Sequence, residues 1–491
     1  MKVRLFTTLF LLVSAMLAAQ SVKSPNVVII LADDLGIGDL TCYNPGSQIS
    51  TPVLDGMAEQ GLRFTDAHSG SSVCTPTRYG LLTGRYAFRS PLKKGVLFGY
   101  SPSLIEADRF TLADLLHQAG YYTGVIGKWH LGLDWATLKE PARLTGDNDP
   151  ANFALRERVR QGPNDLGFDY SFVLPASLDM APYVFVENGR VTPPTLRQIA
   201  GNHEPRGVFW REGSAGADFR LEETLDRIAD KGCAFIRQRA DRETPFFLYL
   251  PLTSPHTPWL PKGTFRGKSG AGTYGDFVMQ TDAAIGRVLH TLDSLRLREN
   301  TLVIVTSDNG SDWKDADKQQ FPKHRANGPY RGEKSDIWEG GHRIPFLVRW
   351  PAGIPRTGVT SQTICLTDLM ATLASLTRQT LKAGDGPDSF DFSSLFSPEN
   401  RKKPVRQTTI HHSIDGLFAL REGRWKYIDG SGSGGWSKDS SATGDWPEQL
   451  YDLDADPGET TNLARQFPDL TSRLRNTLHK QQEQGFTRSN P

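Results

Sequence analysis

The strongest constraint on the fold is a recurring pattern in which a short apolar run is closed by polar residues or glycine. The stretch NVVIILADDLG covers residues 26–36, and TLVIVTSDNG covers residues 301–310. Further runs of this kind begin at Thr123, Pro245 and Pro345. Such short runs, rich in branched residues, are typical of strands. Because they are apolar throughout, we expect them to be buried on both faces of a parallel sheet.

Helical segments lie between these runs. In TPVLDGMAEQG, Thr51 can cap a helix, Pro52 suits its first turn and Gly61 can end it. TLADLLHQAG, which begins at Thr111, repeats the pattern. The alternation of strands and helices predicts an α/β fold with a large, mostly parallel sheet flanked by helices. Sheets of this kind bind ligands beyond the carboxyl ends of their strands.

The character of the chain changes near residue 400. The segment TTIHHSIDGLFALREGRWKYIDG has the short strands and Asp-Gly and Glu-Gly turns of an antiparallel sheet. A Gly/Ser-rich loop follows it, and the chain then ends in a polar helix. We therefore expect a catalytic α/β domain over residues 21–400 and a smaller C-terminal α+β subdomain over residues 401–491.

The N-terminus and the overall charge limit where the protein acts. Residues 1–20 have a basic start, an apolar run and small residues near Ala19, which predicts a signal peptide and export to the periplasm or the medium. A buried N-terminal helix is the alternative interpretation. The formal net charge of +1 gives no reason to expect a nucleic-acid partner. No later segment is apolar for about 18 residues, so we expect no membrane span.

Four cysteines are too few for a disulfide framework even in an exported protein. Cys233 lies in a helical pattern and is most simply a core residue. The sequence leaves open a disulfide between Cys42 and Cys365 without supporting it.

Oxygen ligands gather at two predicted strand ends. Asp33 and Asp34 close the first run, and Asp308 and Asn309 close the run that starts at Thr301. Carboxylate and amide oxygens suit Ca²⁺ or Mg²⁺ rather than Zn²⁺. Either pair alone could be ordinary turn sequence. Because both pairs close strands of one sheet, we favour a metal site.

Cationic residues follow other strands of the same sheet. Lys128 and His130 come after one strand, His256 lies in a Pro-containing loop after another, and Lys334 stands in YRGEKSD. Each one alone could be a surface or structural residue. Gathered beside a cation, they would bind a multiply oxygenated anion, with lysine as charge and histidine as proton carrier.

The segment CTPTR, residues 74–78, places a cysteine in a Ser/Thr/Pro-rich turn ahead of Arg78 and the run YGLLTG. It resembles the C-x-P-x-R maturation motif of type I sulfatases, the formylglycine-dependent, arylsulfatase-like members of the alkaline phosphatase superfamily. GYYTGVIGKWH, SPH, SDNG, GEK before EGGHRIP, and LYDLDADPGETTNL also resemble family motifs, in family order. Together they cover nearly the whole mature chain.

The resemblance implies a cofactor and a set of site residues. A maturation enzyme would convert Cys74 to 3-oxoalanine (Cα-formylglycine), whose hydrate attacks sulfur and later expels sulfate, which is covalent catalysis. Pro76 would delay helix formation so that the segment can be read, and YGLLTG would then form a helix facing the site. One Ca²⁺, or Mg²⁺, would bind to Asp33, Asp34, Asp308, Asn309 and the modified Cys74. The catalytic group would be Cys74, Arg78, Lys128, His130, His256 and Lys334.

The resemblance implies roles for these residues. Arg78 and His130 would hold the hydrate, with His130 as the base, while Lys128 and Lys334 would clamp the sulfate. His256 would protonate the leaving oxygen. Ser177 is expected as a further sulfate contact.

The expected substrate is an O-sulfated glycan or its oligosaccharides. Trp436, in a glycine-rich loop, is the first choice for a sugar contact, and Trp259, His203, Arg211 and Asp179 are further candidates, although each could be an ordinary loop or core residue. Two alternatives stay open: a phosphate mono- or diester hydrolase of the same superfamily, and a non-catalytic glycan-binding protein on this fold.

Overall fold

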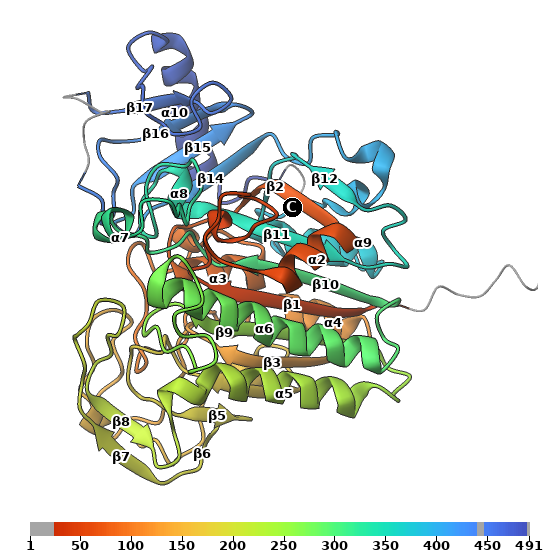
Figure 1. Cartoon of the computed structure of the whole chain (residues 1–491), viewed down its shortest axis with the longest axis vertical. Helices are drawn as coiled ribbons and strands as arrows, with labels where there is room; N and C mark the ends of the chain where they lie inside the picture. Colours follow the sequence, from red (N-terminus) through yellow and green to blue (C-terminus); the bar gives the residue numbers. More distant parts are fainter. Residues whose placement is uncertain (1–23, 439–445, 489–491) are drawn as a thin grey trace, which may run out of the picture.

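The computed structural model describes residues 24–438 and 446–488, so the predicted signal peptide at residues 1–20 lies outside the described residues. A large sheet runs through the middle of the molecule (Figure 1). Its strands follow the order β12-β2-β11-β10-β1-β9-β3-β4-β5-β6, and β13 also pairs with β2.

The centre of this sheet is parallel, as predicted. Five neighbouring strands run in one direction: β10 (Thr301–Ser307), β1 (Asn26–Asp33), β9 (Phe246–Pro255), β3 (Tyr122–Lys128) and β4 (Tyr170–Leu174). The strand expected from Pro345 is β11 (Arg343–Arg349), which runs antiparallel to β10. The carboxyl ends of the five parallel strands therefore meet at one edge of the sheet.

Shorter strands extend the sheet on both sides. On one side lie β2 (Leu62–His68), β12 (Gly358–Thr360) and β13 (Ile364–Cys365), and on the other lie β5 (Phe185–Glu187) and β6 (Arg190–Thr192). A separate hairpin joins β7 (Leu196–Ile199) to β8 (Gly213–Gly216). Strand β2 has no clear signal in the sequence, because its segment LRFTDAH mixes charged and apolar residues.

Helices cover both faces of the large sheet, as the sequence predicts (Figure 1). One layer contains α2 (Pro52–Gln60), α5 (Thr224–Arg239) and α6 (Gly272–Ser294); the other contains α3 (Cys74–Thr83), α4 (Leu112–Gln118) and α9 (Leu369–Leu376). Thr111 caps α4 by accepting a hydrogen bond from the Asp114 N–H. At α2 the cap differs from the expectation, because the Asp282 carboxylate, and not Thr51, accepts from the N–H groups of Val53 and Leu54.

A second, antiparallel sheet near the C-terminus confirms the expected smaller α+β unit. It contains β14 (Thr408–His412), β15 (Phe418–Glu422), β16 (Trp425–Ile428) and β17 (Gln449–Asp452), and α10 (Pro468–Glu483) packs against it. Its contact with the rest of the chain includes the buried ion pair of Lys426 with Glu339, in α8 (Glu339–His342), and Lys426 also pairs with Glu459 within the C-terminal unit. The domain boundary near residue 400 stays a prediction.

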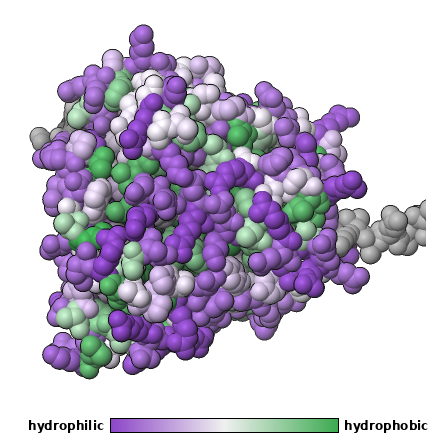
Figure 2. All heavy atoms as spheres, turned by 60° about the horizontal axis from the view of Figure 1, so that its bottom comes forward, coloured by the Kyte–Doolittle hydropathy of each residue, from purple (hydrophilic) through white to green (hydrophobic). Residues whose placement is uncertain are grey.

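Cys42, Cys74, Cys233 and Cys365 are all free thiols, so Cys42 and Cys365 do not form a disulfide. Cys233 is a core residue of α5, as expected. The face in Figure 2 is mostly hydrophilic, with small scattered apolar areas. Among the described residues, no helix combines the length and the apolar character that a membrane crossing requires.

Candidate active site at the carboxyl ends of the parallel strands

The predicted site residues converge at the carboxyl edge of the parallel sheet. Asp33 is the last residue of β1, and Lys128 is the last residue of β3. Asp308 and Asn309 directly follow β10, while His256 directly follows β9. All of these side chains are buried. One sheet edge therefore gathers the residues that the sequence places far apart.

Each of the three carboxylates is paired with at least one cation. Lys128 Nζ lies 2.8 and 2.7 Å from the two carboxylate oxygens of Asp33. Lys334 Nζ donates to Asp34 Oδ2 at 2.7 Å, and Arg78 donates to Asp308 Oδ2 through Nη2 at 2.7 Å and Nε at 3.1 Å. These pairs compensate charges that would otherwise be costly to bury.

Two of the buried aspartates, Asp33 and Asp308, differ in acidity. Burial by itself would raise the pKa of Asp33, but the positive charges of Lys128, His256 and Arg78 hold this pKa far below its usual range. Burial, and then the negative charge of Asp33, raises the pKa of Asp308, although Arg78 lies against it. Two carboxylates in one buried site repel each other, and a bound cation would relieve this repulsion.

Asn309 provides the test of whether this site fits a metal ion. Its side-chain N–H group donates to Asp34 Oδ1 at 2.6 Å and to the Gly310 carbonyl oxygen at 3.0 Å. Its carbonyl oxygen is buried, yet it has no hydrogen-bond partner within residues 24–438 and 446–488. A free amide oxygen beside carboxylates is a donor set for Ca²⁺ or Mg²⁺. The residues present therefore fit the predicted hard cation.

Cys74 is the first residue of helix α3 and is buried. The expected helix over YGLLTG is thus longer than predicted and already contains the motif, since Pro76 is tolerated in the first helical turn. Burial raises the pKa of the Cys74 thiol, although the charges of Lys128 and Lys334 act in the opposite direction. The position at a helix N-terminus, beside two lysines, favours an anion next to this residue.

His130 has one free ring nitrogen. Its Nε2 lies 2.8 Å from the Leu97 carbonyl oxygen, which can only accept, so Nε2 carries the proton. Burial, and then the charges of Lys128 and Arg78, hold the pKa of His130 well below its usual range. The imidazole is therefore neutral, and its Nδ1 is an unprotonated nitrogen without a partner in the described part of the chain. This is the state of a base.

His256 and Ser177 complete the polar wall of the site. His256 Nδ1 lies 2.5 Å from the Thr257 carbonyl oxygen, while its Nε2 lies 3.2 Å from Ser177 Oγ and 3.7 Å from Asp34 Oδ2. Lys128 Nζ donates to Ser177 Oγ at 3.1 Å. Ser177, expected as a further sulfate contact, thus lies within hydrogen-bond distance of both His256 and Lys128.

The predicted sugar contacts divide into two groups. Trp436 is 42% exposed, and its indole centroid lies 5.9 Å from Lys334 Nζ. Arg211 forms an ion pair with Asp179, two residues beyond Ser177. Trp259, in contrast, is buried in the core against Tyr274, so it is not a surface contact, and His203 is an exposed residue beside Phe209.

One neighbour of the site was missed. Lys314 precedes α7 (Asp315–Gln320), and its Nζ lies 5.0 Å from the Trp436 ring centroid. A lone lysine in a polar segment carries no signal in the sequence. Its place over Trp436 depends on the packing of the C-terminal loop, which is attached by the hydrogen bond from the Trp436 N–H to Ser335 Oγ at 2.9 Å.

Comparison with known proteins gives a consistent assignment. The sulfatase family model matches residues 25–379. The chain is 36% identical to an N-acetylgalactosamine-6-O-sulfatase of Bacteroides thetaiotaomicron, covering 94% of this chain and 93% of that protein. It is 34% identical to human arylsulfatase A, with 90% of this chain and 83% of that protein covered.

A solved structure from work on glycosaminoglycan metabolism by Bacteroides thetaiotaomicron agrees. It superimposes with a TM-score of 0.80 at 34% identity and covers 93% of this chain and 99% of its own. The family model, the two relatives and this structure each span most of the chain, and the residues matched by the family model include the strand ends at Asp33, Lys128, His256 and Asp308. The chain therefore belongs to the formylglycine-dependent sulfatases of the alkaline phosphatase superfamily and is a sulfuric ester hydrolase.

Proposed function

We propose that this sulfatase removes the 6-O-sulfate group of N-acetylgalactosamine in glycosaminoglycan saccharides, with Cys74 converted to formylglycine and Ca²⁺ bound. The substrate is suggested by the Bacteroides relative that carries this activity in its name. The observation that carries the reaction is that Lys128 and Lys334, bound to the carboxylate cluster, both act with their charge on Cys74, the first residue of α3.

The chain's own charges suit a sulfate group. In the carboxylate cluster, Lys128 is bound to Asp33 and Lys334 to Asp34. Both would bind sulfate oxygens and stabilise the negative charge that develops on them. Ser177 Oγ, held by Lys128, adds a neutral hydrogen bond. Arg78 holds Asp308 in place and reaches the Lys128 carbonyl oxygen at 2.9 Å.

The metal and the modified residue supply the chemistry that side chains alone lack. Asp33, Asp34, Asp308 and Asn309 would hold the cation, which neutralises charge beside the nucleophile. Formylglycine at position 74 would supply, once hydrated, two hydroxyl groups on one carbon for the transfer of a sulfuryl group. A plain alcohol at this position would keep its sulfate ester.

Two histidines would move the protons. His256 Nε2 faces Asp34 and Ser177, and in its protonated form it would donate to the leaving sugar oxygen. His130 is neutral with an unprotonated Nδ1, which suits a base that takes a proton from the nucleophile residue. The two roles need opposite protonation states, and the two imidazoles lie in different surroundings.

The decisive experiment has two parts. Peptide mass spectrometry of the purified enzyme should show Cys74 converted to formylglycine. The matured enzyme, given saccharides sulfated at defined positions, should release sulfate fastest from N-acetylgalactosamine 6-sulfate. A preference for another position or sugar would refute the substrate, and full turnover by Cys74→Ala would refute the nucleophile.

Export completes the proposal. N-terminal sequencing of the protein from its host should begin near residue 20, after removal of the predicted signal peptide. A protein that retains residues 1–20 and stays in the cytoplasm would contradict export while leaving the sulfatase assignment intact.

A further inference from the structure

A pocket outside the carboxyl-end cluster has a volume of about 540 Å³, which is enough for one or two sugar rings. Two segments and one strand form it: the loop that follows β1, the segment before Lys334, and β2. The lining residues are Ile37, Gly38, Tyr43, Asn44, Pro45, Gly46, Arg63, Thr65, Lys323, Arg325, Gly328, Pro329 and Tyr330.

All charged side chains that line this pocket are positive. Arg63, Lys323 and Arg325 contribute three cations, and no aspartate or glutamate is among the lining residues. Lys323 and Arg325 are exposed, and neither forms an ion pair with the residues that the structure describes. The whole chain has a formal net charge of only +1. Three cations around one concave site are therefore a local concentration of charge that favours an anionic ligand.

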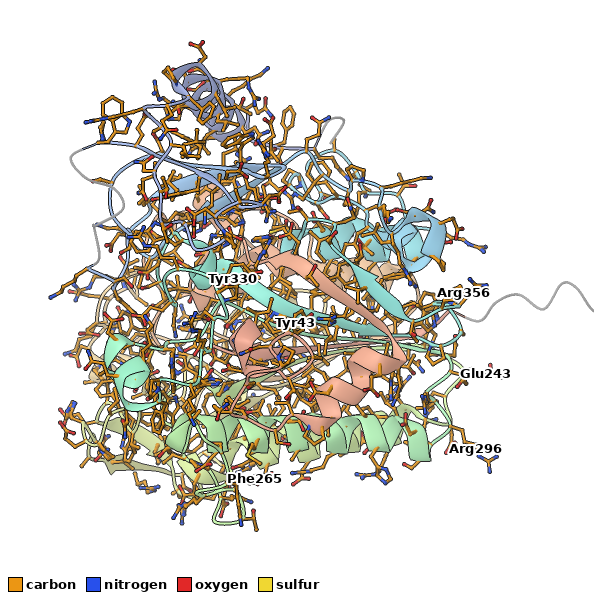
Figure 3. All side chains as sticks on the ribbon, turned by 45° about the horizontal axis from the view of Figure 1, so that its top comes forward. Tyr43, Glu243, Phe265, Arg296, Tyr330 and Arg356 are labelled. Carbon is orange, nitrogen blue, oxygen red and sulfur yellow. The ribbon has the colours of Figure 1, made fainter. Side chains whose placement is uncertain are left out.

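Two tyrosine rings give the pocket flat apolar surfaces. Figure 3 shows Tyr43 and Tyr330 on neighbouring segments, and both line the pocket. The Arg63 guanidinium lies 5.2 Å from the centroid of the Tyr43 ring. Aromatic rings beside hydrogen-bonding and charged groups are suited to binding a sugar ring that carries an acidic group.

The walls of the pocket are held in place by buried contacts. Tyr43 Oη donates to the Phe64 carbonyl oxygen at 2.9 Å, and Arg343 Nη1 donates to Tyr330 Oη at 2.6 Å. Between the two loops, the buried His324 Nε2 and Asp39 Oδ1 lie 2.9 Å apart. Binding would therefore order little of the protein, which favours affinity.

Gly38 shows how closely the two loops approach. Its N–H donates to the Ala326 carbonyl oxygen at 2.7 Å, and an added Cβ would lie 2.0 Å from the Arg325 carbonyl oxygen. Only glycine fits this contact. The pocket is thus a built feature of the fold.

The pocket is separate from the carboxyl-end cluster. It includes none of the residues assigned to sulfate, metal or proton transfer. The buried Asp39, which accepts from His324, also accepts from Tyr274, whose hydroxyl reaches the Asp34 carbonyl oxygen at 3.4 Å. These contacts form a layer of protein between the pocket and the carboxylates.

We infer that this pocket is a second, non-catalytic site that binds an anionic, sulfated saccharide chain. The inference extends the proposed function, because the same polymer would then contact the enzyme at two places. The tyrosines would face sugar rings, and Arg63, Lys323 and Arg325 would pair with sulfate or carboxylate groups. Binding here would raise the local concentration of chain ends at the active site.

The test measures binding separately from turnover. Calorimetry would measure the binding of chondroitin 6-sulfate chains to the full-length Cys74→Ala protein. The pocket would be unchanged in one protein and would carry Lys323→Glu and Arg325→Glu in the other. We expect the charge reversal to weaken binding by about tenfold, because two attractive contacts become repulsive. The control is Lys402→Glu with Lys403→Glu, which changes two exposed lysines and the net charge by the same amount. The control should bind within about twofold of the unchanged surface.

Kinetics provide the second measurement. In the matured enzyme, Lys323→Glu with Arg325→Glu should raise KM for polymeric chains and leave kcat and the turnover of a small aryl sulfate unchanged. Equal chain affinity in the two double variants would overturn the inference. Duplex DNA binding as tightly as the saccharide, with the same dependence on Lys323 and Arg325, would also overturn it, because the site would then be unspecific. Neither result depends on which sulfate the enzyme removes.

Discussion

Lys128 and Asp33 end two strands that are not neighbours in the sheet, yet the Lys128 ammonium touches both carboxylate oxygens of Asp33 at 2.8 and 2.7 Å. Strand β9 lies between β1 and β3, so the pair reaches across the carboxyl end of an intervening strand. Both side chains are fully buried. The contact fixes the lysine beside the carboxylates, where it would meet a sulfate group.

The role of His256 makes the effect of its loss depend on the leaving group. His256→Ala should lower kcat on a sulfated saccharide by about 10²–10⁴-fold, because a sugar alkoxide leaves only with a proton. Turnover of a nitrophenyl sulfate, whose phenolate leaves unaided, should fall much less. Steady-state kinetics on both substrates measure the difference. Equal losses on the two substrates would contradict the general-acid role.

Asn309→Ala should weaken binding of Ca²⁺ by at least about tenfold, because the variant lacks the free amide oxygen at the carboxylate cluster. A thermal melt provides a measurement that is independent of activity. After a chelator removes divalent cations, added Ca²⁺ should raise the Tm of the wild type, since a ligand that binds only the folded state stabilises it. The same shift should need more Ca²⁺ in Asn309→Ala. If neither the chelator nor added Ca²⁺ changed the Tm of the wild type, this site would hold no metal.

Trp436 should affect the saccharide and not the sulfate. Trp436→Ala is expected to raise KM for the sulfated saccharide by about threefold to tenfold, the loss of one aromatic contact, with kcat little changed. Trp436→Phe should retain most of the affinity because it keeps a flat ring. A small aryl sulfate serves as the control substrate, and its KM should be the same in all three proteins. If the alanine variant matched the wild type on the saccharide, Trp436 would be a loop residue only.

Lys426 should be essential for stability. Its Nζ lies 3.1 Å from Glu339 Oε1 and 2.9 Å from Glu459 Oε1, and all three side chains are fully buried. Lys426→Met should cost about 3–5 kcal/mol, because two buried carboxylates lose the cation that they share, although Glu339 also pairs with Arg343. Arg473→Met, which removes an exposed ion pair with Glu422, is the matched control and should cost under about 1 kcal/mol. Denaturant unfolding of the two variants compares their free energies of unfolding. Similar losses in the two variants would show that the buried ion pairs of Lys426 contribute no more to stability than the exposed pair does.

Asp282 gives a pH dependence of stability. Burial raises its pKa from 3.8 to about 6, even though the N–H groups of Leu54 and Val53 donate to it. The folded state therefore holds this proton more tightly than the unfolded state, so the contribution is complete below the unfolded pKa and is lost as the pH rises through about 6. Between about pH 5 and about pH 7, the wild type should lose about 1 kcal/mol more stability than Asp282→Asn. Unfolding at both pH values measures this, and parallel profiles would contradict it.

The local patterns were sufficient for the strands and for the chemistry at their ends. The apolar runs at residues 26–33 and 301–307 form β1 and β10, and the acids that close them meet in space. This worked because a strand buried on both faces is apolar throughout, and because parallel strands bring their carboxyl ends to one edge. The chemistry of Cys74 and the roles of Lys128, His256 and Lys334 came from the resemblance to family motifs.

Long-range packing decided what the sequence could not. Thr51 has the residue type of a helix cap, but Asp282, from a helix far along the chain, provides the cap of α2. Trp259 and Trp436 look alike in the sequence, yet one is in the core and the other is 42% exposed beside Lys334. The cationic pocket joins Arg63 to Lys323 and Arg325, which no local pattern connects. The spacing of apolar residues along the sequence indicates which side of a helix or strand is buried. Strand order and contacts between loops are determined only when the whole chain folds.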